Sequence, residues 1–494
     1  MDNIIENKAV KTEVIPGLQH PSGITRESAL LLAALKHKQV RFAHWKSNGH
    51  LLWSLAGKTD LDLLIYPQDR KAFESVMQQL AYKKLQSQPW SSYPDVEDWI
   101  GLDEETGNFL HLHTHYALVT GIKHVKHLYL PWMAEFFQHV QTDPQTGWPV
   151  PRPELEAVIL LIRIWAKMPP EVRLKSKPEV PFFMVEELVG LLNNTNPGDI
   201  LHICSKLKLQ VPPDLDQRIA GIRADAGSGE ILNLARYFYG QVKPHYRKSW
   251  PLAVAESFLY KGILKIIPYT ARFIGPVSMG KRLVSGGKII ALVGCDGSGK
   301  SSLSQDILNW LTYKTDTHYF YLGKNPFIKS YNKKILSWEE LLFRNSFVAK
   351  ALKKLIGKFY YVILIHRKVA MLQLARKMRR QGSVILCDRF PQQEIPGMND
   401  GPNLSSSFNH WASALERQQF RQARSVGADL VFRLQVSPET AARRKPEHNY
   451  NQIKVKSENM KHILFPGAVV IDIDAEQSYA QVLLTIKRTI WKNL

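Results

Sequence analysis

Cysteine is scarce in this sequence, which holds only Cys204, Cys295 and Cys387 among 494 residues. Thiols so few and so far apart exclude a disulfide framework and a cysteine metal cluster, and they suggest a reducing compartment. Long apolar runs are also missing. No stretch of about 18 uncharged apolar residues occurs, and the first residues lack the basic region and apolar core of a signal peptide. We therefore expect a soluble, cytoplasmic protein.

Acidic residues are outnumbered, with 44 Asp and Glu against 65 Lys and Arg and a formal charge of +21. Residues 1–150 hold 14 Lys and Arg against 16 Asp and Glu, a net charge of −2, so the remaining chain carries +23. Such a surplus suits anionic ligands: nucleotides, phosphorylated metabolites, nucleic acid or an acidic membrane surface. The charge surplus does not choose among these ligands. A solvated basic surface without a partner would also account for the surplus.

Three blocks divide the chain, at residues 1–150, 151–285 and 286–494, in keeping with the roughly two to four domains expected at this length. The first block has the pattern of a small α/β domain. Its predicted helices cover 27–38 and 71–80, and its predicted strands cover 40–45, 61–66 and 109–115.

The middle block begins at Pro151 and Pro153 and is predicted to be helical throughout. A following segment, 253–268, is both basic and apolar. It could lie on an acidic membrane surface, but apolar helix faces usually belong to a core. We therefore favour a connecting helix packed between domains. The predicted helices of the middle block cover 155–168, 185–192, 199–207 and 220–239.

The third block alternates strands with helices, which predicts a parallel sheet with helices on both faces. Its first strand leads directly into a glycine-rich turn at residue 294, described next. The strands after that turn are predicted at 317–322, 383–387, 429–436 and 468–473.

The run Gly294-Cys-Asp-Gly-Ser-Gly-Lys-Ser301 matches the G-x-x-x-x-G-K-[ST] pattern of a phosphate-binding loop. Backbone N–H groups of such a loop cradle phosphates at a helix N-terminus. We expect Lys300 to reach the β- and γ-phosphates of ATP and the Ser301 hydroxyl to ligand Mg²⁺. A glycine turn without a ligand is the other interpretation, and the strand before the turn and the helical pattern after it disfavour that one. The predicted ATP-binding residues are Gly294, Asp296, Gly297, Ser298, Gly299, Lys300, Ser301 and Ser302.

Charged residues follow two later strands of the same block. Asp388 and Arg389 end the predicted third strand, at the sheet edge where ligands of parallel sheets bind. Asp388 could hold Mg²⁺ or accept a proton, and Arg389 could grip the anionic group of an acceptor. Arg443 and Arg444 lie on a predicted helix after the fourth strand, from which they could stabilise a phosphoryl group in transfer. A surface ion pair and a solvated helix end are the alternatives.

These three motifs resemble the phosphate loop, the Asp-Arg-aromatic motif and the lid of thymidylate kinases, over about the last 210 residues. The resemblance implies that Arg389 contacts the acceptor phosphate and that Asp388 supports magnesium and catalysis. Two segments depart from that family, 322–326 and 391–402, which in thymidylate kinases help to hold the monophosphate and to frame thymine. We therefore regard ATP use as better supported than thymidylate use. Lys324 is the predicted replacement contact for the acceptor, with Arg367, Arg376 and Arg379 as further candidates.

The first block carries Asp60 and Asp62 at alternate positions of a strand start, so both carboxylates face one side and could bind Mg²⁺ with a nucleotide. With Lys46-Ser47-Asn48 upstream, the block resembles the nucleotidyltransferase superfamily, in an uncharacterised bacterial branch sometimes fused to kinase-like domains. That resemblance implies a third carboxylate on a later strand, where the sequence has histidines. They are His111, His113 and His115, which suit a metal site or, as we favour, a hydrogen-bonded strand face.

We therefore expect a phosphotransferase of the thymidylate-kinase-like group that uses ATP and Mg²⁺, with a nucleotidyltransferase-like first block and a helical middle. The expected acceptor is a phosphorylated small molecule, with a nucleoside monophosphate among the candidates. One alternative is nucleotidyl transfer at Asp60 and Asp62. Another is a nucleotide-gated binding protein without catalysis, acting on nucleic acid or membrane. Nucleic acid stays open as a partner, and a membrane surface is disfavoured.

Overall fold

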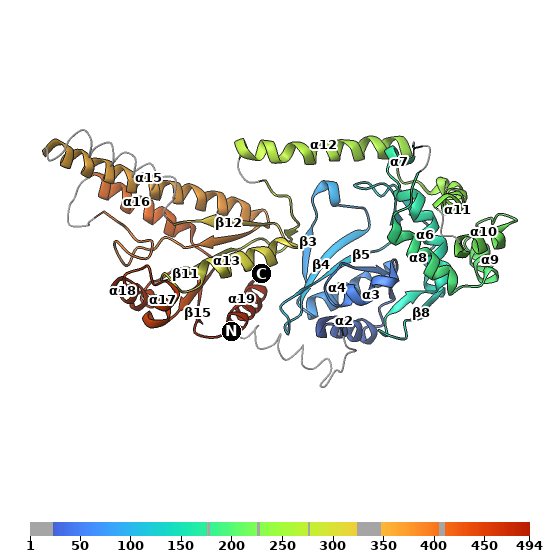
Figure 1. The fold of residues 1–494 in the computed structure, drawn as a ribbon, viewed down its shortest axis with the longest axis horizontal. Helices are drawn as coiled ribbons and strands as arrows, with labels where there is room; N and C mark the ends of the chain where they lie inside the picture. The colour runs from blue at the N-terminus through green and yellow to red at the C-terminus, as the bar shows by residue number, and fades with distance from the viewer. Residues whose placement is uncertain are drawn as a thin grey trace. The chain divides into compact units, whose positions relative to one another are not determined.

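The computed structural model describes residues 23–173, 175, 178–224, 228–274, 277–323, 347–404 and 411–494. The chain forms two compact units, Met1–Val277 and Ser278–Leu494 (Figure 1). The first and middle blocks of the sequence therefore fall within one unit, and the phosphate-loop block forms the other. Each unit is described by itself.

The first unit is built on a mixed sheet in which β1, β2, β5, β4 and β3 are neighbours in that order. Only β2 and β5 pair in parallel, and the other neighbours are antiparallel. Strand β5 has the predicted bounds, whereas β3 and β4 were not predicted. The strands are β1 (Phe42–His44), β2 (Leu61–Ile65), β3 (Lys83–Gln86), β4 (Val96–Leu102) and β5 (Phe109–His115), and the helices beside them are α2 (Arg26–His37), α3 (Leu51–Leu55) and α4 (Arg70–Gln79).

Side chains alternate between the two faces of this sheet, as the pleat requires. Leu61, Leu63 and Leu112 belong to the core under α2 and α4. The residues between them, including Asp62 and His113, point to the opposite face. Polar groups of several strands therefore share one face of the sheet.

The helical part of the first unit packs around α6 (Pro153–Lys167), whose first residue is a proline suited to a helix start. Its core includes Ala43, Trp45 and Leu64 of the sheet, so helices and sheet share one hydrophobic core. The residues predicted to form a single helix over 220–239 belong to two helices, Leu215–Ala224 and Ser228–Gln241. The other helices are α7 (Pro170–Arg173), α8 (Phe182–Asn193), α9 (Pro197–Lys206), α10 (Leu215–Ala224) and α11 (Ser228–Gln241).

Helix α12 (Trp250–Ile274) ends the first unit. Its buried Ala253 packs with Ile122 and Val125, while Phe258, Leu259 and Ile266 are exposed. In the part of the chain that the structure describes, no helix has both the length and the apolar character needed to cross a bilayer.

The second unit has a five-stranded sheet of order β12, β13, β11, β14, β15, and every neighbouring pair is parallel. This confirms the predicted parallel sheet, and each predicted strand agrees with the structure to within one residue at either end. The strands are β11 (Ile289–Gly294), β12 (Thr317–Tyr321), β13 (Val384–Asp388), β14 (Leu430–Gln435) and β15 (Val469–Asp474).

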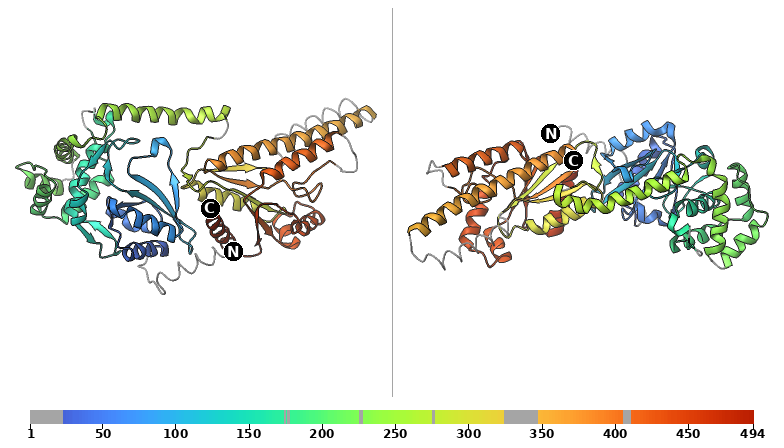
Figure 2. Two further views of the ribbon diagram at one scale, coloured as in Figure 1. Left: turned by 180° about the vertical axis from the view of Figure 1, so that it is seen from behind. Right: turned by 90° about the horizontal axis from the view of Figure 1, so that it is seen from above.

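Helices cover both faces of this sheet, as predicted. Ile289, Ala291 and Val293 of β11 share a core with Ile365 of α15 (Phe347–Arg380) and Phe420 of α16 (Trp411–Val426). Figures 1 and 2 show α15 and α16 side by side on this face, with α13 (Lys300–Thr312) and α19 (Tyr479–Asn493) on the other. The turn between β11 and α13 therefore opens at the carboxyl edge of the strands.

The buried carboxylate of Asp316 links the start of the second unit to β12 and β13 through hydrogen bonds. It accepts hydrogen bonds from the Gly280 N–H at 3.2 Å, the Ser383 hydroxyl at 2.5 Å and His318 Nε2 at 3.2 Å. Burial alone would raise the pKa of Asp316, but the hydrogen bonds from His318 and Ser383 outweigh it and lower this pKa to about 2. The folded state therefore stabilises the ionised carboxylate of Asp316.

We predict that Asp316→Asn destabilises the protein by about 1–3 kcal/mol at neutral pH, because buried donors lose a charged acceptor. The carboxylate's contribution is present above its unfolded pKa and is lost as the pH falls from about 4 towards 2, so the variant should lose less stability in that window. Urea unfolding followed by circular dichroism measures both effects. Glu458→Gln, at an exposed position, is the control. Equal stability of Asp316→Asn and the unchanged protein would contradict this role.

Candidate functional site

The turn after β11 has the backbone of a phosphate-binding loop. Gly297 and Gly299 adopt positive φ angles of 87° and 89°, and Gly299 caps the N-terminus of α13. Because only glycine adopts these angles without strain, the sequence fixes the turn at these two positions. The first turn of α13, with its unpaired N–H groups and exposed Ser301 and Ser302, therefore faces solvent at the strand edge.

Lys300 is buried and folds back over the loop. Its Nζ donates to the carbonyl oxygens of Gly294 at 2.9 Å and Cys295 at 2.6 Å, and to Ser298 Oγ at 3.3 Å. Burial, and then the nearby charge of Arg389, lower the pKa of Lys300 to about 8. A cation held this way has weak, neutral acceptors, so an anion entering the loop would be a stronger partner.

Asp388 ends β13, beside the loop strand. It pairs in register with Leu292 of β11 and Tyr321 of β12, and its carboxylate accepts a hydrogen bond from the Tyr319 hydroxyl at 2.9 Å. Only 3% of the residue is exposed. A buried carboxylate at this edge has the chemistry of a ligand for Mg²⁺ shared with the Ser301 hydroxyl.

Arg389 adopts a left-handed backbone conformation with φ of 70°, which turns its side chain back towards the loop. Its guanidinium lies 3.4 Å from Asp296 of the loop and 3.5 Å from Asp400. Arg389 follows β13 and the loop follows β11. The structure therefore brings together two groups that lie far apart in the sequence. Asp400 was not singled out by the sequence.

Lys368 is a second cation on Asp400, at 3.1 Å, and both side chains are nearly buried. It comes from α15, the helix on which Arg367, Arg376 and Arg379 were named as candidates for the acceptor. Of these, Arg379 pairs with Asp429, which lies before β14 at the opposite edge of the sheet. The signal for Lys368 was present in the sequence, because it occupies the apolar stripe of α15, where a charge needs a partner.

Two short helices stand over the loop, α17 (Pro438–Arg444) and α18 (Tyr450–Met460). Lys456 of α18 pairs with Asp296 at 2.7 Å. Burial would raise the pKa of Asp296, but the Lys456 partner lowers it to about 2. The sequence missed Lys456 because nothing in the local spacing of α18 marks it.

The arginines expected over the nucleotide lie elsewhere on α17. Arg444 donates to the Ala475 carbonyl oxygen at 3.1 Å, in the turn after β15, and Arg443 is exposed. The backbone of α17 packs against the backbone of Gly297 in the loop. The approach is so close that a Cβ added to Gly297 would lie 2.4 Å from the Ala441 carbonyl oxygen. Lys324, the predicted acceptor contact, falls outside the described residues.

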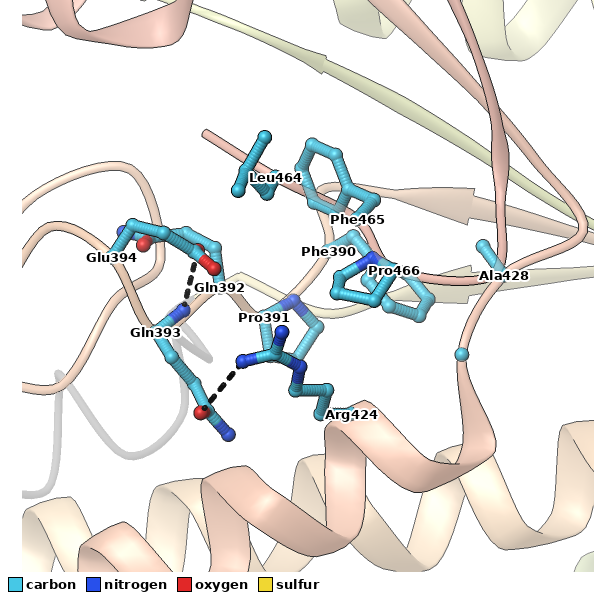
Figure 3. Close-up of a pocket in the computed structure, with 11 residues that line it drawn as sticks. Phe390, Pro391, Gln392, Gln393, Glu394, Arg424, Ala428, Leu464, Phe465 and Pro466 are labelled. Atoms are coloured by element: carbon cyan, nitrogen blue, oxygen red, sulfur yellow. Dashed lines mark hydrogen bonds between the residues drawn. The ribbon is translucent and has the colours of Figure 1, made fainter. Parts of the chain in front are cut away.

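A small cavity of about 10 Å³, room for about one water molecule, adjoins the loop between Gly294, Arg389, Asn399 and Asp400. A second small cavity, of about 20 Å³, lies behind it and is shown in Figure 3. The rings of Phe390 and Phe465, 6.2 Å apart, line both and separate them. Arg389 and Asp400 therefore line the cavity beside the loop.

The cavity in Figure 3 is lined by residues that follow the carboxyl end of β13, including Pro391 and Gln393, and by Ala428 and Pro466, which precede β14 and β15. Arg424 donates to Gln393 at 3.5 Å across it. This cavity shares Phe390 and Phe465 with the cavity beside the loop.

The first unit has a polar cluster of its own, on the sheet face that carries Asp60 and Asp62. His111 Nδ1 lies 2.8 Å from Asp60, and its Nε2 lies 3.0 Å from Asp98 of β4. Asp98 is a further carboxylate on this face, which the sequence analysis did not single out. Strand pairing, rather than sequence spacing, brings it to this face, because β4 pairs antiparallel with β5.

Asp62, His113 and His115 each offer one ligand atom, and these atoms lie within 4.8 Å of one another. The ammonium of Lys46 lies among them, 2.7 Å from Asp62 and 3.4 Å from His115 Nε2. Burial would raise the pKa of Asp62, but Lys46 and hydrogen bonds from both histidines hold it well below its usual range. One carboxylate and two imidazoles could also hold a divalent metal ion.

Residues of the helical part complete this cluster. Glu156 of α6 accepts hydrogen bonds from the backbone N–H and side chain of Asn48, at 3.1 and 2.7 Å, and burial raises its pKa to about 7. Arg163 of the same helix is 3% exposed and lies 5.8 Å over the ring of Trp45, next to Lys46. Its Nε and Nη1 atoms form no hydrogen bond within the described residues.

We predict that Gly297→Ala separates α17 from the loop, because the new methyl group meets the Ala441 carbonyl at a residue with positive φ. The cost should be about 1–2 kcal/mol from the backbone angle, with the steric clash added. Thermal unfolding measures the loss, and hydrogen exchange of residues 438–444 should speed up. Gly357→Ala, within α15 and with open space around it, is the control and should be neutral or stabilising. Unchanged exchange in α17 would contradict the steric interpretation.

No family model matches this chain. Over 217 residues, 41% of the chain, it is 28% identical to a protein of Escherichia coli strain K12 named "Uncharacterized ATP-binding protein YghR", and the match covers 86% of that protein. Over 225 residues it is 27% identical to "Uncharacterized ATP-binding protein YghS" of the same strain, covering 41% of this chain and 92% of that protein.

Two solved structures are also similar. Deoxyadenosine kinase from M. mycoides with bound dATP is 16% identical, with 41% of this chain and 98% of that chain covered and a TM-score of 0.25. Thymidylate kinase from Candida albicans is 16% identical, with 42% and 92% covered and a TM-score of 0.27. About two fifths of the chain is thus similar to proteins named for ATP binding.

Proposed function

We propose that the second unit is a phosphotransferase that uses ATP and Mg²⁺ and passes the γ-phosphate to an anionic small molecule. One observation carries the proposal: the glycine turn with its buried Lys300 and the Asp388-Arg389 pair meet at the carboxyl edge of one parallel sheet. The names of the E. coli relatives support ATP as the ligand.

The residues of the loop fit ATP. The two positive-φ glycines leave the loop amides free to face a phosphate chain, and Lys300 would exchange its carbonyl acceptors for the β- and γ-phosphates. Ser301 and Asp388 would hold Mg²⁺. That ion would neutralise charge on the phosphates during transfer.

Asp400 suggests how the acceptor binds. Its carboxylate accepts from Lys368 and faces Arg389 beside the loop, in the position of a bound anion. A phosphate of the acceptor would compete with this carboxylate for the two cations, and Arg389 would then orient it towards the γ-phosphate. A nucleoside monophosphate is the acceptor that the resemblance to thymidylate kinases favours.

The helices over the loop would close on bound ATP. Lys456 already holds Asp296 of the loop, and Arg443 and Arg444 are carried by α17, which touches Gly297. On closure these arginines would stabilise the phosphoryl group in transfer and exclude water.

We predict transfer of label from γ-labelled ATP to at least one acceptor in a panel of nucleoside monophosphates, nucleosides and phosphorylated sugars. Lys300→Ala should lower the rate by about a hundredfold or more, because the phosphates lose their buried cation. Scintillation counting of separated products measures it. Lys492→Ala, an exposed lysine of α19, is the matched control. ATP binding without transfer to any acceptor would contradict the kinase and favour a nucleotide-gated binding protein.

A second candidate function, nucleotidyl transfer by the first unit, is supported by the buried Arg163. A guanidinium with two nitrogens unpaired among the described residues is a donor for phosphate, and it lies beside Trp45 and Lys46, next to the Asp62 cluster. Asp60 and Asp62 would hold the metal ion of a nucleotide, and Glu156 would accept a proton from the attacking hydroxyl.

Label from α-labelled ATP tests this second function. If the first unit transfers nucleotides, Asp62→Asn should lower the transfer by about a hundredfold or more, since a metal ligand is lost. Lys300→Ala should leave that transfer intact, and Asp199→Asn, at an exposed position of α9, is the matched control. Transfer that persists in Asp62→Asn would contradict this assignment.

A further inference from the structure

The helical part of the first unit holds a large cleft that neither candidate function uses. It has a volume of about 650 Å³ and opens to solvent between α6, α7, α11 and the start of α12. Six of the side chains that line it are Trp165, Arg173, Arg236, Tyr239, Lys243 and Trp250.

This cleft is separate from the Asp62 cluster. Arg163 and Trp165 are two residues apart on α6, which places them about 200° apart around the helix. Arg163 lies over Trp45 of the sheet, whereas Trp165 lines the cleft. The same helix therefore presents one site on each side.

Aromatic rings and a guanidinium form the wall of the cleft. The Arg173 guanidinium carbon lies 5.4 Å from the ring centre of Trp165, 5.3 Å from that of Tyr239 and 5.5 Å from that of Trp250. The guanidinium carbon of Arg236 lies 5.8 Å from the ring centre of Trp165. Flat rings and guanidinium planes at this density are the surfaces on which nucleobases stack.

The positive charge in the cleft is not balanced locally. Its lining residues include Arg173, Arg236 and Lys243 and no acidic residue. Burial, and then the Arg173 charge, lower the pKa of nearby His127 to about 4. Arg173 Nε and Trp250 Nε1 are buried donors that form no hydrogen bond among the described residues.

We propose that this cleft binds a nucleoside phosphate. The base stacks against the tryptophan and tyrosine rings, and the phosphate lies between Arg236 and Lys243, with Arg173 behind it. The rings recognise the planar part and the three cations recognise the anion, so neither adenosine nor inorganic phosphate alone satisfies the site. The proposal does not depend on the phosphate loop, which lies in the other unit.

Photolabelling with 8-azido-AMP tests the proposal on the full chain. The probe is crosslinked by light, and labelled peptides are identified by mass spectrometry, so that a label in the cleft is distinguished from one in the second unit. We expect labelling within residues 236–251, and competition by AMP at lower concentration than by adenosine or inorganic phosphate. Labelling confined to the second unit, or equal competition by adenosine and AMP, would overturn the proposal.

Charge variants make the test specific. Arg236→Gln combined with Lys243→Gln should reduce labelling of the cleft by about tenfold or more, because two charged contacts to the phosphate are lost. Both residues are exposed, so the fold should tolerate the change. The control combines Lys206→Gln with Lys265→Gln, which removes the same charge from exposed positions outside the cleft.

Equal labelling in the two double variants would overturn the proposal. Loss of labelling in the cleft variant alone supports it. Labelling of peptides in the second unit is followed in the same samples, so a failure of the kinase proposal and a failure of this one give different results.

Discussion

The second unit depends on the hydrogen bonds between the buried ammonium of Lys300 and the loop. Burial disfavours a charge that lacks strong acceptors, yet Lys300 is held by two loop carbonyls and one hydroxyl. The loop can wrap the ammonium this closely only because Gly297 and Gly299 adopt positive φ angles. The same geometry leaves room for the backbone of Ala441 to rest against Gly297. The lysine, the glycines and the helix above them are therefore a single steric and electrostatic arrangement.

Both units pair several of their buried or partly buried cations with carboxylates of the same unit. Lys46 is paired with Asp62, Lys368 with Asp400, and Lys456 with Asp296. These carboxylates stabilise the folded chain, because an uncompensated buried cation is costly. They also compete with an incoming phosphate, so part of the binding free energy is used to break an existing pair. Lys300 differs, since its hydrogen-bond acceptors are neutral oxygens of the loop. Arg163 differs because two of its nitrogens form no hydrogen bond among the described residues.

The features predicted from the sequence are those encoded by neighbours along the chain. The phosphate loop lies within eight residues, and β5 and the parallel sheet follow from local apolar patterning. Asp98 could not be predicted in the same way, because strand pairing brings it to its site from a distant position. The place of Lys368 in an apolar stripe indicated a need for a partner, but helix packing, not local sequence, brings Asp400 to it. Strand β4 was missed since Glu97 and Asp98 interrupt its apolar pattern, although both charges are satisfied by partners on opposite faces. The helix that carries Arg443 and Arg444 was predicted correctly, but it meets the loop through backbone and its arginines lie elsewhere.

A few of the 51 Lys and Arg residues of 151–494 are buried rather than part of the basic surface. Arg163, Lys300 and Lys368 are each at least nine-tenths buried, and Arg173 lies among three rings. Burying so many positive groups lowers stability unless anions or aromatic faces offset the cost. Exposed lysines can serve solubility alone, but buried and partly unpaired guanidinium groups have no such use. The positions of these buried cations, more than the total charge, are therefore the basis on which we propose binding of phosphorylated ligands at more than one place.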